Sequence, residues 1–209
     1  MPETTIFQPK QRRSQDTQQK LIAALHHCLQ DKFFEHISIK DLAEHAGVSV
    51  GTFYRRFKDK ESLLPLLYQD FGHDLDLWVS ELEQQHCNDL TQALQYICQQ
   101  TCQFLCSRQS IFRTLHLNSR LHSEIIASDK LVNRENIYQR ISALILRHQS
   151  EITVIDKSQS ADLAVFMMVS TLLDKVLYPT LTPALASKLS LDAFAAELPK
   201  VLVAYLKSA

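Results

Sequence analysis

The residues best suited to chemistry lie between Ser49 and Arg56, and the chemistry that they suit is the reading of DNA. Arg55 can donate two hydrogen bonds to a guanine, and Thr52 can bond a base or touch a thymine methyl group. Gly51 has no side chain, so its backbone can approach a groove closely. In a helix Gly51 and Arg55 share one face, with Thr52 beside them. This face predicts contacts with base edges in a major groove.

The residues around this face are suited to binding phosphates. Tyr54, Arg56 and Lys60 can donate to phosphate oxygens from its periphery. Residues 1–13 are polar and basic and are predicted to form a mobile arm that reaches the neighbouring backbone or minor groove. The predicted DNA-binding residues are Arg12, Arg13, Ser38, Ser49, Val50, Gly51, Thr52, Tyr54, Arg55, Arg56 and Lys60.

Three cysteine thiols form a second group of residues that could take part in chemistry. Cys98, Cys102 and Cys106 recur at intervals of four and share one helical face. They could sense oxidants or bind a soft metal. A disulfide between neighbours is disfavoured because both Cβ atoms point the same way along the helix. We favour the simpler interpretation that they are small apolar residues packed against a neighbouring helix.

Other catalytic or cofactor chemistry is not indicated. The chain has nine histidines but no pair at i, i+4 and no H-E-x-x-H, so no metal site is predicted. No nucleophile–base pair or phosphate-binding loop is evident, so the sequence predicts neither an enzyme nor a bound cofactor.

The elements that position the DNA-reading face are predicted to be helices. From Ser14 an apolar stripe predicts a first helix, which includes Leu21, Ile22, Leu25, Cys28 and Leu29. A short helix follows Ser38, with Asp41 completing a capping box and Gly47 ending the helix. Ser49 caps a second short helix over 50–57, whose Val50, Phe53 and Phe57 face the core. The motif 38–57 is therefore a helix-turn-helix.

The remainder of the chain also favours helices. It has only three glycines, so few tight turns can be built. A long helix is expected over 60–85, with a bend or a late start at Pro65. Further helices are expected over 89–107, 109–117, 120–149, 159–177 and 191–207. The fold class is thus all-α with about nine helices.

The stretch around the turn resembles the TetR family of transcriptional regulators. It reads AGVSVGTFYRRFKDKESL, and the resemblance extends over about 14–70. The residues that carry it are Ile39, Asp41, Leu42, Ala43, Ala46, Gly47, Val48, Ser49, Gly51, Thr52, Phe53, Tyr54, Phe57, Lys60, Glu61 and Leu64. Many members have a histidine where this chain has Arg55, which leaves the base preference open.

The resemblance implies two domains. Residues 14–74 form a three-helix DNA-binding domain, and 75–209 form a helical domain that binds an effector and dimerises. The last two long helices are implied to pair with a second subunit as a four-helix bundle. Candidate interface residues are Phe166, Val169, Leu173, Phe194, Leu198 and Leu202. Candidate ligand-binding residues are Tyr96, Cys102, Phe112, Arg113, Tyr138, Phe166 and Met167.

Charge and hydropathy agree with a DNA-binding protein of the bacterial cytoplasm. Residues 1–60 hold ten of the 22 basic and seven of the 23 acidic residues, which leaves the remainder acidic. A basic end of this kind suits a polyanionic partner. No apolar run reaches the roughly 18 residues of a membrane span, and the N-terminus has no apolar signal region. The five cysteines are interpreted as reduced thiols.

Two functions from different classes follow. The first is a homodimeric repressor that a small-molecule effector releases from a palindromic double-stranded DNA operator. The second is an effector-independent DNA-binding protein that acts through protein partners as a nucleoid or division factor. The effector, operator and regulated genes are not encoded in any local pattern.

Overall fold

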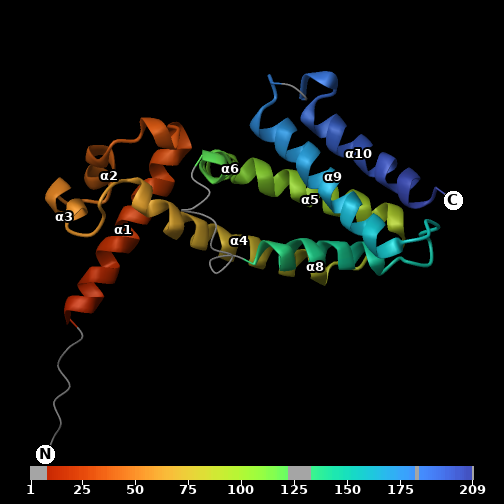
Figure 1. Cartoon of the computed structure of the whole chain (residues 1–209), viewed down its shortest axis with the longest axis horizontal. Coiled ribbons are helices and arrows are strands. Elements are labelled where there is room, and N and C mark those ends of the chain that lie inside the picture. The colour runs from red at the N-terminus through yellow and green to blue at the C-terminus, as the bar shows by residue number, and fades with distance from the viewer. Residues whose placement is uncertain (1–8, 122–132, 182–183, 209) are drawn as a thin grey trace, which may run out of the picture. The chain divides into compact units, whose positions relative to one another are not determined.

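The computed structural model describes residues 9–121, 133–181 and 184–208, with side chains from residue 15 onward. Within these ranges the chain is helical and has no strand, which confirms the predicted all-α class (Figure 1). The α-helices are α1 Pro9–Asp31, α2 Ile39–His45, α3 Val50–Tyr54, α4 Leu64–Gln84, α5 Leu90–Ser107, α6 Gln109–Leu121, α8 Arg134–Leu146, α9 Lys157–Leu177 and α10 Leu191–Leu206. Short 3₁₀ turns are η1 Phe34–His36, η2 Glu61–Leu63 and η3 Ala184–Ala186.

The chain divides into two compact units. The described residues up to Asp70, together with those from Arg113 to Leu121, form an N-terminal unit. Residues 71–112 and the described residues from 133 onward form a C-terminal unit. The part of α6 from Arg113 onward therefore belongs to the N-terminal unit, whereas the sequence assigned all residues beyond 74 to the C-terminal domain.

The N-terminal unit is built on the predicted apolar stripe. Leu21, Leu25 and Leu29 of α1 are buried, as are the stripe's Ile22 and Cys28. α1 packs on α2, and α2 packs on α3. The small buried residues Ala43 and Ala46 lie on α2 and at its C-cap. Burial of these side chains from water supplies most of the driving force for this unit.

Local signals account for the helix boundaries in this unit, with two differences at α1 and α3. α1 begins at Pro9, so the backbone of 9–13 is helical and is not part of an arm; proline is favoured in the first turn, where its missing N–H has no partner to lose. α3 ends at Tyr54 and does not reach Phe57. α4 starts at Leu64 after η2, which places Pro65 in its first turn and confirms the late start.

The C-terminal unit packs its helices around one apolar core. α5 lies against α9 and α10, and α8 lies against α9 (Figure 1). The core includes Leu94, Ile141, Met168 and Leu202. The single helix expected over 120–149 is wrong, because α8 starts only at Arg134. The Asn133 side chain accepts a hydrogen bond from the Asn136 amide and caps the N-terminus of α8. Helical periodicity alone does not reveal that a new helix begins here.

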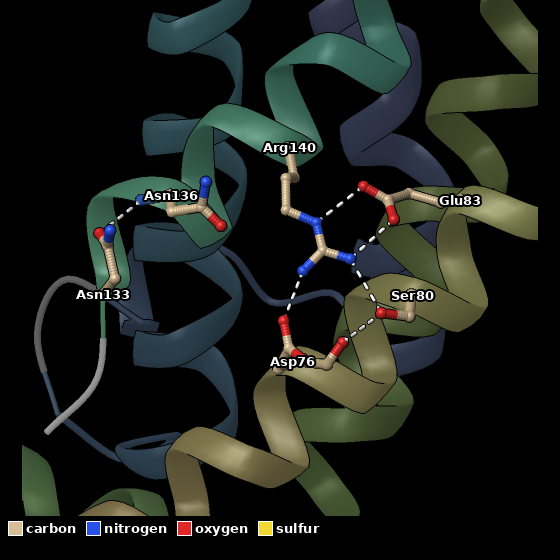
Figure 2. A network of polar contacts seen from close by, with 6 residues as sticks. All are labelled: Asp76, Ser80, Glu83, Asn133, Asn136 and Arg140. Atoms are coloured by element: carbon tan, nitrogen blue, oxygen red, sulfur yellow. Dashed lines mark hydrogen bonds and ion pairs between the residues drawn. The ribbon is translucent and has the colours of Figure 1, made fainter.

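A polar clamp joins α8 to α4 within the C-terminal unit. Figure 2 shows Arg140 reaching from α8 to three side chains of α4. Its Nε and Nη2 donate to the two carboxylate oxygens of Glu83 at 2.8 and 2.6 Å. Its Nη1 donates to Asp76 at 2.6 Å, and Nη2 also donates to Ser80 at 2.9 Å. Such a two-pronged pairing fixes both distance and orientation between the helices.

The helices were also expected to include no membrane span. None of the helices in the described parts of the chain combines the length and the apolar content that a span requires.

Candidate nucleic-acid interface

The second helix of the helix-turn-helix is fixed from behind by one aromatic anchor. Phe53 is fully buried and its ring contacts those of Phe57 and Tyr54, at centroid distances of 5.5 and 5.7 Å. The turn before α3 passes through Gly47, whose φ of 64° lies in the left-handed region that favours glycine. Both features agree with the sequence prediction. The anchor and the turn together set the direction of α3.

A chain of hydrogen bonds runs along the outer side of α3. The Ser49 hydroxyl accepts from the Thr52 amide at 3.1 Å and lies 2.9 Å from the Thr52 hydroxyl. Arg55 Nη2 then donates to Thr52 Oγ1 at 2.8 Å. The guanidinium is therefore held on the same exposed side as Thr52, with its remaining N–H groups available to a partner. Ser49 is therefore the N-cap of α3 and the first residue in this series of hydrogen bonds.

The backbone at Gly51 is accessible. A Cβ placed on Gly51 would meet only the Ser49 hydroxyl, at 3.8 Å. The fold itself therefore does not require glycine here, unlike at Gly47. The open space beside Gly51 would let another molecule approach the backbone of α3 closely.

Three further candidates flank this face. Tyr54 is exposed, and Arg56 is half-buried. Val50 is 39% exposed, so the expectation that it packs into the core is wrong. It is the first residue of a helix of five residues, and its side chain projects outward while Phe53 provides the inward contact.

Ser38 has a structural role. Its hydroxyl donates to Asp41 Oδ2 at 2.8 Å and accepts from the Asp41 amide at 3.0 Å, while the Ser38 amide donates to the same carboxylate. These hydrogen bonds lower the pKa of Asp41 to about 2. The predicted capping box is confirmed, and the single hydroxyl proton of Ser38 is already used within the box.

Lys60 is likewise engaged inside the N-terminal unit. Its Nζ donates to the carbonyls of Phe34, Glu35 and Ile37 at 2.8, 3.0 and 3.2 Å, and it lies 4.9 Å from the centre of the Phe34 ring. An ammonium group has three donors, and all three are occupied. The phosphate contact predicted for Lys60 does not fit this geometry, because its donors are used within the unit. Sequence spacing could not show this, since the three carbonyls lie more than twenty residues away in the chain.

The basic arm lies mostly outside this description. Residues 1–8 are not described, and neither are the side chains of Lys10, Arg12 and Arg13. Their predicted role in DNA binding stays a prediction.

The candidate ligand residues do not converge on one pocket. Tyr96 lines a cavity of about 240 Å³ in the C-terminal unit. Cys102 is buried in the core, and Phe112 contacts the rings of Phe71 and Phe104 at 4.6 and 5.8 Å. Met167 packs partly buried against the core, and Tyr138 is 45% exposed.

Two other candidates are corrected. Arg113 belongs to the N-terminal unit, where its guanidinium stacks on Phe33. Phe166 is 67% exposed, so it lines no enclosed site in this unit. Helical spacing placed both residues near other candidates, but spacing does not reveal which unit or which face a side chain joins.

The thiol stripe suits the packing interpretation. Cys98 and Cys102 are buried, and burial raises their pKa values to about 12 and about 11. A thiol is reactive as its thiolate, so both are unreactive at neutral pH. Cys106, at the end of the stripe, is exposed.

The predicted dimer residues fall into three groups by burial. Leu198 and Leu202 are buried in the core of their own subunit, so their assignment to an interface is wrong: this face of α10 is already covered. Val169, Leu173 and Phe194 are partly buried. Phe166 is exposed, and so are Leu163 on α9 and Val201 on α10. Val201 was not among the interface residues predicted from the sequence.

A capped helix-turn-helix is typical of DNA-binding proteins, and in the described parts of the chain it is followed only by further helices. Residues 21–67 match the sequence model of the family described as "Bacterial regulatory proteins, tetR family". The predicted resemblance to the TetR family is thereby confirmed over this segment.

Comparison with curated proteins finds helix-turn-helix regulators that match about a third of the chain. An HTH-type transcriptional regulator of Staphylococcus aureus strain USA300 is 30% identical over 71 residues, which are 34% of this chain and 37% of that protein. The same values hold for its counterpart in strain NCTC 8325. The chain thus spans little more than a third of the curated relatives that it matches.

Solved structures extend the likeness in fold to most of the chain. The TetR-family regulator PfmR of Thermus thermophilus is 15% identical, with a TM-score of 0.60 over 88% of this chain and 96% of its own. FadR of Bacillus subtilis, solved with stearoyl-CoA, is 18% identical, with a TM-score of 0.61 over 90% and 98%. FadR of Bacillus halodurans is 16% identical, with a TM-score of 0.63 over 92% and 97%. Each of these three proteins is described as a regulator.

Proposed function

We propose that this chain is a sequence-specific DNA-binding transcriptional regulator that represses its target genes. The observation that carries the proposal is the outer face of α3. It presents Gly51 without steric cover and Arg55 held beside Thr52, while the buried Phe53 supports the helix from behind. A face of small residues with one oriented guanidinium fits a major groove about 12 Å wide.

The protein acts as a homodimer in this proposal. Leu163 and Phe166 of α9 and Val201 of α10 expose large apolar side chains on the C-terminal unit. Exposed apolar residues of this kind are typical of subunit contacts. Two copies related by a two-fold axis would place two α3 helices in successive major grooves about 34–36 Å apart, so the operator is a palindrome.

A small molecule bound to the C-terminal unit controls release from the operator. The fold of this unit occurs in FadR of Bacillus subtilis, which was solved with stearoyl-CoA. A ligand that binds one conformation of the C-terminal unit more tightly would change the fraction of molecules that are in the DNA-binding conformation. In this proposal the protein is located in the cytoplasm, where it is bound to the DNA of the nucleoid.

Selection of bound sequences from a random double-stranded pool tests the proposal. We expect recovery of one palindromic sequence, bound by the full chain with a Kd of about 10⁻⁸ M or tighter at physiological salt. Phe166→Glu should give folded monomers that bind weakly and without sequence preference. Leu77→Glu, at an exposed apolar position of α4 outside the proposed interface, is the matched control and should bind as the parent does. Recovery of unrelated sequences would overturn the proposal and favour an effector-independent nucleoid protein.

A further inference from the structure

A cavity of about 240 Å³ opens in the C-terminal unit between the end of α4, the start of α5 and the end of α8. Its floor is apolar and consists of the buried residues Leu82, Ala93, Ile97 and Leu144. The volume is at or just below the lower end of the range for small-molecule sites, which begins at about 300 Å³. The space therefore suits one compact ring and not a long chain.

The rim of this cavity is polar and biased toward positive charge. Arg147 provides a permanent cation, and His86 and His148 contribute polar imidazole nitrogens. No aspartate or glutamate is among the described residues that line the cavity. The lining thus combines an apolar floor with a cationic rim, which is the complement of an organic anion.

Three carboxylates near this rim have hydrogen-bond or ion-pair partners of their own. Glu83 is held by Arg140 in the clamp described above. Glu151 pairs with Lys207 at 2.8 Å, and it also accepts from the Leu90 amide. Asp89 accepts from the Gln92 amide as the cap of α5. None of the ion pairs in the described parts of the chain includes Arg147.

Arg147 itself retains donors for a ligand. Its Nη1 donates to the backbone carbonyl of Glu83 at 3.1 Å, which holds the side chain across the gap from α8 to α4. A guanidinium has five N–H donors, so one such bond leaves two adjacent N–H groups that can donate to both oxygens of a carboxylate. Tyr96 also lines the cavity and carries a hydroxyl group.

From this geometry we propose that the cavity is a binding site for a compact organic carboxylate, with the ring on the apolar floor and the carboxylate on Arg147. The inference rests on the proposed function in that it names the ligand class of the C-terminal unit. Binding can nevertheless be measured without DNA, so the two proposals succeed or fail separately.

Calorimetric titration of the full chain with sodium benzoate tests the site. Benzamide is the matched neutral probe, since it has the same ring and no charge. We expect benzoate to bind with a Kd of roughly 1 mM or tighter, and benzamide to bind about tenfold more weakly or not at all. Arg147→Gln should weaken benzoate binding by about tenfold or more, because it removes a charge-assisted hydrogen bond. Arg134→Gln, at the exposed start of the same helix, should leave it unchanged.

Alkylation of the two accessible thiols locates the bound probe without any mutation. Cys87 lines the cavity, whereas Cys106 is exposed elsewhere on the unit. Saturating benzoate should slow the alkylation of Cys87 by iodoacetamide and leave that of Cys106 unchanged, as measured by peptide mass spectrometry. Absence of benzoate binding at about 10 mM, equal binding by folded Arg147→Gln, or unprotected Cys87 would each overturn the inference. A protein that binds benzoate but no operator would overturn only the proposed function.

Discussion

The guanidinium of Arg113 lies flat against the ring of Phe33, with 3.4 Å between its Cζ atom and the ring centroid. Arg113 is in α6, and Phe33 lies in the connection between α1 and η1. Both belong to the N-terminal unit, so this contact ties α6 to the segment that carries the helix-turn-helix. An arginine that sequence reasoning placed in a ligand pocket thus serves the domain that carries α3.

Removal of this stacking contact should destabilise the N-terminal unit. We expect Arg113→Ala to lower the free energy of unfolding by about 1 kcal/mol, because a partly desolvated cation–π contact is lost. Phe33→Leu should cost a similar amount, and the double variant should cost less than the sum. Denaturant unfolding of the four proteins measures the coupling. Additive costs would show that the two side chains do not interact in solution.

Arg55 should determine base preference at one position in each half-site. Arg55→Ala is expected to cost about 1–3 kcal/mol of binding and to relax selectivity at that position. Thr52→Val removes the oxygen that holds the Arg55 guanidinium, so it should weaken the same preference less severely. Competition binding with operators changed one base pair at a time measures both effects. Uniform weakening on every operator would identify Arg55 as a phosphate contact.

Two glycines should respond in opposite ways to the same substitution. Gly51→Ala leaves the fold intact, since its Cβ meets nothing closer than 3.8 Å, but it should weaken operator binding. Gly47→Ala should instead cost about 1 kcal/mol of folding stability, because an L side chain is strained at positive φ. Thermal unfolding and gel-shift titration of both variants separate the two effects. Full operator affinity in Gly51→Ala would argue against a close backbone approach.

Lys60 should act on stability and not on the salt dependence of DNA binding. Lys60→Ala leaves three carbonyls without their donor and is expected to cost roughly 1.5–3 kcal/mol. The slope of log Kd against log salt should stay the same, whereas a lost phosphate contact would reduce it by about one unit. Lys58→Ala, at a neighbouring position, controls for the loss of one positive charge.

The clamp between Arg140 and Glu83 should make stability depend on pH in the acid range. Pairing with Arg140 lowers the pKa of Glu83 below its value in the unfolded chain. A lowered carboxyl pKa stabilises the fold above the unfolded pKa, near 4.5, and this contribution is lost as the pH falls through the folded value. Glu83→Gln should therefore lower stability at pH 7 by about 1 kcal/mol and show less dependence on pH in the acid range. Urea unfolding at several pH values measures both effects.

Much of the candidate site was predictable because its determinants are local. The Ser38–Asp41 box, the left-handed Gly47 and the Ser49 cap each involve residues within four positions of one another. Backbone sterics and short-range hydrogen bonding decide such features wherever the segment lies. The pattern of buried leucines in α1 was predictable for a related reason, since helical periodicity sets which residues share a face.

Tertiary packing alone decided what the distant polar residues do. Lys60 meets carbonyls 23 to 26 positions away, and Arg140 meets Glu83 from 57 positions away. Only packing brings such groups within hydrogen-bond distance, and no periodicity encodes it. The same holds for Leu202, whose apolar spacing fits an interface as well as a core. An apolar stripe indicates that a face will be covered, but the arrangement of the other helices determines whether its own subunit or a second one covers it.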